Sequence, residues 1–182
     1  MGRGKPAPEL DPDADPAAVA RAIVLRQLTN SPKSRQQLAR KLAERHVPED
    51  VAEAVLDRFE EVQLVDDAGF AQMWVRSRAQ TRSLARGAIR RELADKGIGA
   101  DTAEEALGQI SDQDEQAAAA ALVRRKLRPG MGLEERPERD KHIRRLVGML
   151  ARKGYPPGMA FRLADQEIDR FLQQGQGGGA WD

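Results

Sequence analysis

The sequence predicts an all-α protein made of three consecutive three-helix units, nine helices in all. Three observations lead to this fold class: a helical segment that recurs three times, blocks of charge that follow the recurrence, and almost no strand signal. Aromatic residues make up only 4% of the 182 residues, and β-branched residues never alternate with period two, as half-buried strands require. Because a unit of about 45 residues buries little core alone, we expect the units to pack on their neighbours in an elongated chain.

The recurrence is clearest in three ten-residue strings that align without gaps. They begin at Leu38, Ile89 and Leu146, which are 51 and then 57 residues apart. Each string has two apolar residues four positions apart, then an alanine, a basic residue, a turn residue and a closing apolar residue. The turn residues are His46, Gly97 and Gly154. Composition alone can make Ala-, Leu- and Arg-rich helices look alike, but matching turn positions favour a true repeat.

Residues 17–65 form the first predicted unit. Its first helix is expected over residues 17–29, because Asp15 and Pro16 supply an N-cap and a proline at the first turn. Ser34 and Gln37 fit a capping box at the start of the middle helix. A second apolar stripe follows Pro48 and predicts the third helix of the unit.

The second unit is predicted over residues 66–110 and the third over residues 111–174. Their first helices are expected over 67–82 and 112–127, with caps supplied by the residues just before them. A loop over 128–137 accounts for the longer spacing of the third copy. The cap candidates are Asp66 and Asp67 for the first helix of the second unit, Ser83 for its middle helix and Ser111 for the first helix of the third unit. The segments 1–16 and 175–182 have the composition of disordered tails.

Charge is distributed in alternating blocks, although the whole chain carries a net charge of only +1. Residues 21–46, 74–96 and 124–153 carry +6, +5 and +7, whereas residues 47–73 and 97–123 carry −7 and −6. Each basic block covers the middle helix of a unit, and each acidic block covers a third helix. The chain is therefore predicted to present charge directionally.

No set of residues in the sequence predicts catalysis, a cofactor or a metal site. The chain has no cysteine and two histidines, and it lacks the glycine-rich phosphate loops and the His-Glu-x-x-His zinc motif. The absence of cysteine suits a reducing cytoplasm, and no apolar run is long enough to span a membrane. The sequence therefore indicates a cytoplasmic binding protein rather than an enzyme.

The basic blocks of units two and three supply the candidate contact residues. Such blocks fit nucleic-acid phosphates or an acidic protein surface. The alternative is a solvated helix face whose partners are the acidic third helices of the same chain. The candidates are Arg76, Arg78, Arg82, Arg86, Arg90, Arg91, Lys96, Arg124, Arg125, Lys126, Lys141, Arg144, Arg145, Arg152 and Lys153.

Two other functions are compatible with the residues alone. Three-helix units suggest a helix-turn-helix transcriptional regulator, in which a later helix enters the major groove, but phosphates would repel the acidic third helices of units one and two. A helical adaptor with no nucleic-acid role is the second. The few aromatic residues fall at apolar helical positions, so a base-stacking platform is not expected.

The central motifs resemble those of the RecX family, which regulates the RecA recombinase. The resemblance covers residues 18–172. Its motifs are Val62-x-Leu64-Val65-Asp66-Asp67-x-x-Phe70-Ala71, Val75-Arg76-Ser77-Arg78, Ile89-x-x-Glu92-Leu93-x-x-Lys96-Gly97-Ile98, Ser34-Arg35-x-x-Leu38-x-x-Lys41-Leu42 and Leu146-x-x-x-Leu150-x-x-Lys153-Gly154-Tyr155. One departure is the segment 82–87, where many family members have a Gly-x-Gly-Pro turn.

The resemblance implies three tandem three-helix repeats in a curved, elongated molecule, which we expect to act as a monomer. It further implies binding along RecA filaments on single-stranded DNA, with inhibition of ATP hydrolysis, strand exchange and co-protease activity, and hence a role in DNA repair and recombination. We expect the basic helices of units two and three to face the filament and its DNA. Several repeats would then bridge adjacent RecA subunits and gain affinity through multivalency.

Overall fold

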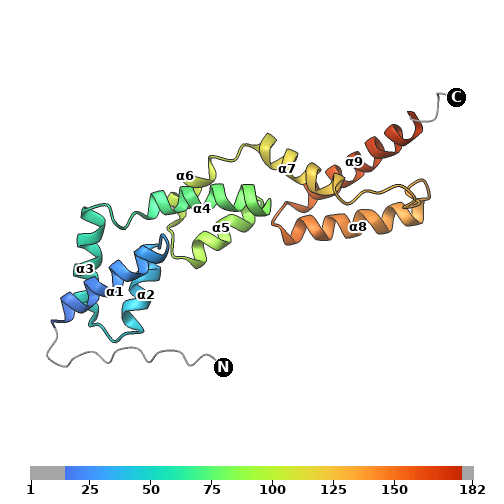
Figure 1. The fold of residues 1–182 in the computed structure, drawn as a ribbon. Helices are drawn as coiled ribbons and strands as arrows, with labels where there is room; N and C mark the ends of the chain where they lie inside the picture. Colours follow the sequence, from blue (N-terminus) through green and yellow to red (C-terminus); the bar gives the residue numbers. More distant parts are fainter. Residues whose placement is uncertain (1–14, 178–182) are drawn as a thin grey trace, which may run out of the picture. The chain divides into compact units, whose positions relative to one another are not determined.

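The computed structural model describes residues 15–177, which form nine α-helices and no strand (Figure 1). The all-α prediction is therefore confirmed. The helices are α1 (Pro16–Asn30), α2 (Arg35–Ala43), α3 (Glu49–Glu61), α4 (Asp67–Arg82), α5 (Arg86–Asp95), α6 (Ala100–Leu107), α7 (Asp112–Arg124), α8 (Arg136–Arg152) and α9 (Pro157–Gly177). None of these helices is long and apolar enough to cross a membrane.

The described residues fall into two compact units. They are called unit 1 and unit 2 from here on, as distinct from the three predicted three-helix units, which are called the first, second and third copies. Unit 1 extends to Phe70 and includes the turn Lys96–Ile98, and unit 2 contains Ala71–Asp95 and the residues from Gly99 onward. The predicted boundaries after residues 65 and 110 lie between helices. Of the predicted tails, residues 1–14 and 178–182 lie outside the described residues, whereas Asp15 caps α1 and α9 extends to Gly177.

Side-chain caps begin several of the helices, as their sequences predict. The Asp15 carboxylate accepts hydrogen bonds from the amides of Ala17 and Ala18 at 3.1 and 3.2 Å. Complete capping boxes are present at the starts of α2 and α7, and Asp66 accepts a hydrogen bond from an amide in the first turn of α4. These bonds satisfy amide groups that have no partner inside the helix.

The three aligned turn residues all adopt the left-handed conformation that ends a helix. The φ angles of His46, Gly97 and Gly154 are 58°, 80° and 89°. The amide of Val47, which follows His46, donates a hydrogen bond to the Leu42 carbonyl at 3.2 Å. The amide of Tyr155, which follows Gly154, donates to the Leu150 carbonyl at the same distance. The recurrence in the sequence is therefore a recurrence of helix ends.

Unit 1 has a core formed by α1, α2 and α3, which all contact one another. Apolar side chains from all three helices are fully or almost fully buried in it. Examples are Val24, Leu38, Leu42, Leu56 and Phe59.

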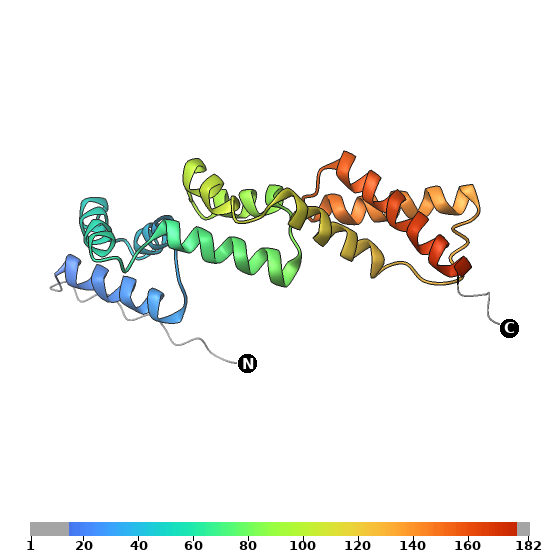
Figure 2. The ribbon, with the colours of Figure 1, turned by 90° about the horizontal axis from the view of Figure 1, so that it is seen from above.

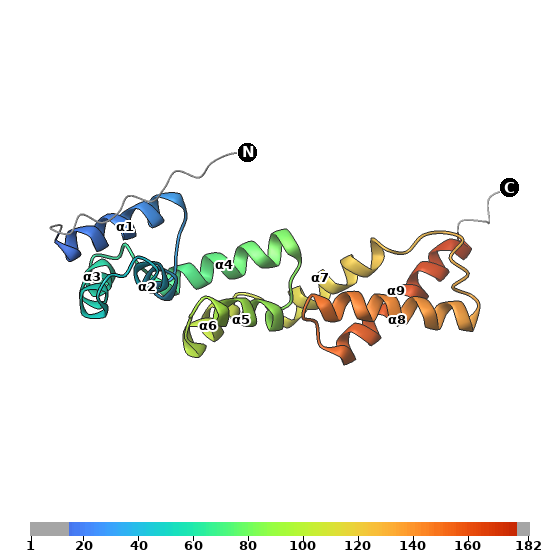
Figure 3. The same cartoon turned by 90° about the horizontal axis from the view of Figure 1, so that it is seen from below.

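Unit 2 contains two sets of packed helices. Helix α5 packs on α6, and α9 packs on both α7 and α8, as Figures 2 and 3 show from opposite sides. The core of α7, α8 and α9 includes Val123, Leu146, Leu150 and Ile168, and it continues through Tyr155 to Ala85 at the start of α5. Arg139 further ties α8 to α9 through Asp165 and Asp169.

Candidate protein and nucleic-acid interface

Several predicted contact residues are held by groups of the same chain. Arg78 pairs with Glu92 at 2.7 Å and lies 3.9 Å from the ring centre of Trp74. Arg90 pairs with Glu104 on α6, through a hydrogen bond of 2.9 Å from Nη2. Lys141 pairs with a glutamate one turn earlier on α8, at 3.1 Å. For Arg78, Arg90 and Lys141, the structure therefore agrees with the alternative in which basic residues pair with acidic residues of the same chain.

Arg86 makes a more buried set of contacts at the start of α5. Its backbone amide donates to Glu115 on α7 at 2.7 Å, and its guanidinium pairs with Glu115 at 3.1 Å and with Asp112. Glu115 is only 5% exposed. The hydrogen bond that its guanidinium donates to Asp112 raises the pKa of Arg86. Arg86 therefore fastens α5 to α7 and has little capacity left for a partner molecule.

The cap of α5 corrects one expectation. Ser83 was the predicted cap of this helix, but α5 begins three residues later, at Arg86. The first amide of α5 is instead satisfied by the carboxylate of Glu115, which comes from another helix. Ser83 has a left-handed φ of 48°, and its carbonyl accepts a hydrogen bond from the Tyr155 hydroxyl at 3.0 Å.

The same arrangement occurs inside unit 1. There the amide of Arg35, at the start of α2, donates to the Asp67 carboxylate at 2.8 Å. Arg35 and Arg86 stand 51 residues apart, which is the spacing of the first two copies. In the first and second copies, the first amide of the middle helix thus donates a hydrogen bond to a carboxylate on the first helix of the next copy.

A second pair of contacts recurs beside the first. The hydroxyl of Ser34 donates to the carbonyl of Lys96 at 2.5 Å, and the amide of Ala85 donates to the carbonyl of Lys153 at 3.0 Å. The Lys153 ammonium also donates to the carbonyl of Arg82, the last residue of α4, at 2.6 Å. Lys96 and Lys153 therefore help to join consecutive copies, although the sequence predicted both as partner contacts.

A second buried carboxylate lies in the third copy. Glu167 on α9 is 2% exposed and pairs with Arg124 on α7 at 3.2 Å and with Arg170 at 2.5 Å. Neither Glu115 nor Glu167 was predicted from the sequence. A signal was present: Glu115 shares the apolar stripe of α7 with Ala119 and Val123, at positions i+4 and i+8.

The remaining candidates are exposed, and their side chains make no ion pair with any other residue of the described part of the chain. They lie on α4, α5, the end of α7 and α8. They are Arg76, Arg82, Arg91, Arg125, Lys126, Arg144, Arg145 and Arg152. These are the cations that remain available to a partner.

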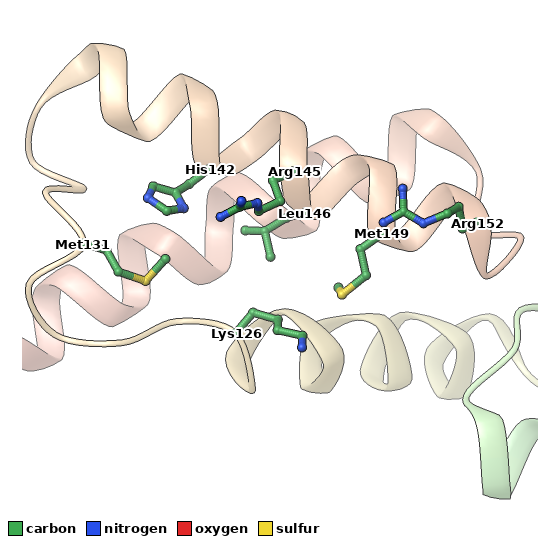
Figure 4. Close-up of a pocket in the computed structure, with 7 residues that line it drawn as sticks. All are labelled: Lys126, Met131, His142, Arg145, Leu146, Met149 and Arg152. Carbon is green, nitrogen blue, oxygen red and sulfur yellow. The ribbon is translucent and has the colours of Figure 1, made fainter.

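Three of these cations line one pocket of about 430 Å³ in unit 2. Figure 4 shows Lys126 at the end of α7, opposite Arg145 and Arg152 on α8. The pocket is also lined by Met131, His142, Leu146 and Met149. We call it the α7–α8 cleft. It combines positive charge with an apolar floor.

Comparison with known proteins decides the family. Two family models match the chain: the first three-helix domain of RecX over residues 20–59, and the second over residues 66–107. Regulatory protein RecX of Streptomyces coelicolor is 50% identical over 159 residues, which cover 87% of this chain and 82% of that protein. The chain belongs to the RecX family of regulatory proteins. The resemblance inferred from its motifs is therefore confirmed.

Other RecX proteins agree with this assignment. Regulatory protein RecX of Thermobifida fusca is 47% identical over 166 residues, which cover 91% of this chain and 85% of that protein. The crystal structure of RecX from Lactobacillus salivarius superimposes with a TM-score of 0.74 at 22% identity, over 85% of this chain and 97% of that one. At this low identity, that structure supports the RecX fold alone.

Proposed function

We propose that this RecX-family protein binds RecA recombinase filaments on single-stranded DNA and inhibits their ATPase, strand-exchange and co-protease activities. The observation that carries the proposal is the 50% identity to a regulatory protein RecX over 87% of the chain. This match spans most of the described helices, so the proposal concerns the whole molecule rather than one of its parts.

The contacts would be made by those predicted contact residues that are exposed and have no ion-pair partner among residues 15–177. Just after α7 and on α8, these include Arg125, Lys126, Arg144, Arg145 and Arg152. Arginine and lysine side chains bind phosphate oxygens without reading the bases, so this contribution would depend on salt and not on DNA sequence. Arg86, Arg90 and Lys153 would contribute indirectly, because they hold the helices that carry these cations.

The repeated architecture supports simultaneous contact with more than one RecA subunit. Within residues 15–177, predicted contact residues without an ion-pair partner occur on α4 and α5 as well as just after α7 and on α8. When several weak contacts belong to one chain, each later contact forms intramolecularly, and the total affinity exceeds that of any single contact. A chain bound in this way would resist the subunit rearrangements that accompany nucleotide turnover.

The test is the DNA-dependent ATPase activity of RecA on single-stranded DNA, titrated with the full chain at two salt concentrations. In the test variant, Arg144, Arg145 and Arg152 are all replaced by Glu. The matched control replaces Arg26, Arg136 and Arg162 by Glu; these arginines are also exposed, and their side chains make no ion pair with residues 15–177. Both variants change the net charge equally.

We expect the test variant to require at least about tenfold more protein for half-inhibition. Its inhibition should also depend less steeply on salt, because charged contacts with the filament are lost. The control should stay close to the wild type. Equal inhibition by the wild type and the test variant would remove the basic face of α8 from the mechanism, and a wild-type chain without inhibition would refute the proposed function.

A further inference from the structure

We propose that the α7–α8 cleft docks an acidic protein segment that carries an apolar side chain. This inference rests on the proposed function, because it names the chemistry of one partner contact within the same basic surface. Its consequence is that this part of the surface contacts protein, whereas the neighbouring cations outside the cleft remain available to phosphates.

The floor of the cleft is apolar and adaptable. Leu146 and Met149 project from α8, and Met131 comes from the connection between α7 and α8 (Figure 4). Met131 and Met149 are only partly buried, although both pack against the core. Methionine side chains adjust their shape to different apolar groups. The floor thus suits one apolar side chain of a partner.

The rim of the cleft is positive on both sides. Lys126 lies at the end of α7, and Arg145 and Arg152 lie two turns apart on α8. None of the three side chains makes an ion pair with another residue of the range 15–177, and no acidic residue lines the cleft. An occupant with negative charge on either side of its apolar group would complement this rim.

The lining favours a protein segment over a DNA strand. Proteins that hold single strands stack the bases mainly on aromatic side chains, but no phenylalanine, tyrosine or tryptophan lines the cleft, and the ring in its lining is the His142 imidazole. A strand would bring phosphates to the rim but no aliphatic group to the floor. An acidic segment with a leucine or similar residue would satisfy both, because arginine binds carboxylates through two parallel hydrogen bonds.

Gly148 supplies a second observation beside the cleft. It lies between Arg145 and Arg152 on α8, at the spacings that put residues on one helix face. A Cβ atom here would meet nothing closer than the Arg152 guanidinium, at 3.6 Å. Since glycine disfavours a helix interior and packing within the protein does not require it here, its absent side chain leaves room for a partner to approach the helix.

The test uses the full chain with 13C-labelled methionine methyl groups, whose resonances report on the floor directly. The Met149 signal is identified with a Met149→Leu variant, and the Met131 signal with Met131→Leu. Three probes are titrated: a short peptide of alternating Glu and Leu, the same peptide with Ser in place of Leu, and a short oligo(dT) strand. We expect the Glu–Leu peptide to shift both signals, with an affinity at least about tenfold higher than that of the Glu–Ser peptide.

Charge reversal then checks the rim. Arg145→Glu should weaken Glu–Leu peptide binding at least about tenfold, whereas Arg144→Glu, the same change one residue outside the lining, should weaken it less than about threefold. Equal binding of the two peptides, equal effects of the two variants, a larger methyl shift with oligo(dT), or no shift with any probe would each overturn the inference. Because this titration contains neither RecA nor RecA-bound DNA, a chain that binds the peptide but does not inhibit RecA would refute only the proposed function.

Discussion

Gly154 lies so close to Ala88 that a Cβ atom at position 154 would be 2.5 Å from the Ala88 backbone nitrogen. Its φ of 89° is also one that side chains disfavour. Gly97 is confined in the same way, with a left-handed φ and the Gln36 side chain against it. At the aligned position of the first copy, His46 has the left-handed φ but is exposed. Glycine therefore occupies this turn in the second and third copies, where a residue of the preceding copy packs against it.

The first prediction follows from this contrast. Gly154→Ala should destabilise unit 2 by more than about 2 kcal/mol, because the left-handed conformation alone costs a side chain about 1–2 kcal/mol and the Ala88 backbone would also have to move. His46→Gly, the control, should raise stability by up to about 1 kcal/mol. Urea unfolding followed by circular dichroism measures both. A Gly154→Ala protein as stable as the wild type would show that the close approach is not required.

Local features of this fold were predictable because each is encoded within a few residues. The capping box of Ser34 and Gln37 and the three turn residues depend only on neighbouring positions along the chain. The contacts between copies were not predictable in this way. Nothing near Arg86 in the sequence indicates that its partner is Glu115, 29 residues further on, since helical periodicity defines a buried face but not what lies against it.

The candidate surface was predictable only in part, for a related reason. The charge blocks identify which helices are basic, but the choice between an internal and an external partner depends on how the helices pack. Arg90 and Arg91 are adjacent in the sequence, yet Arg90 pairs with Glu104 and the Arg91 side chain makes no ion pair with residues 15–177. Consecutive side chains of an α-helix point about 100° apart around the helix axis, so the Arg90 and Arg91 side chains face different surroundings.

The second prediction concerns the buried carboxylate. Glu115→Gln should destabilise the protein by about 2–3 kcal/mol, because it leaves the Arg86 guanidinium without its buried partner and weakens the cap of α5. Glu104→Gln breaks an ion pair of similar composition between exposed side chains, so its effect should be much smaller. Thermal unfolding of the two variants gives the comparison. Similar losses in both would mean that the burial of Glu115 adds nothing.

The third prediction is a dependence of stability on pH. Burial, with a contribution from the charge of Glu115, raises the pKa of Tyr155 from 10.0 to about 12. Between these values the unfolded chain loses the phenolic proton while the folded protein keeps it, so stability falls as the pH rises. The slope from this one group is at most about 1.4 kcal/mol per pH unit.

The check is the difference in unfolding free energy between the wild type and Tyr155→Phe from pH 9 to pH 12. Other groups titrate equally in both proteins and cancel in that difference. The wild type should lose stability faster than the variant above pH 10. Parallel curves would show that the hydroxyl bound to the Ser83 carbonyl titrates as it does in the unfolded chain.

The fourth prediction separates stability from regulation at Gly148. Gly148→Ala should stabilise α8 by about 1 kcal/mol, because alanine favours a helix interior and the added Cβ meets only the Arg152 guanidinium, at 3.6 Å. The same methyl group would lie where we infer that a partner approaches. Inhibition of RecA ATPase activity should therefore require at least about threefold more of the variant, which corresponds to a loss of about 0.7 kcal/mol in binding.

Gly158→Ala is the matched control for this fourth prediction. Gly158 lies in the first turn of α9, where a Cβ would also meet nothing closer than an arginine guanidinium, at 3.7 Å from Arg162, and it is not part of the cleft. This control should inhibit RecA as the wild type does. A Gly148→Ala protein that is more stable and equally inhibitory would show that no partner backbone comes close to α8 at this position, because a methyl group placed in a filled contact must displace part of it.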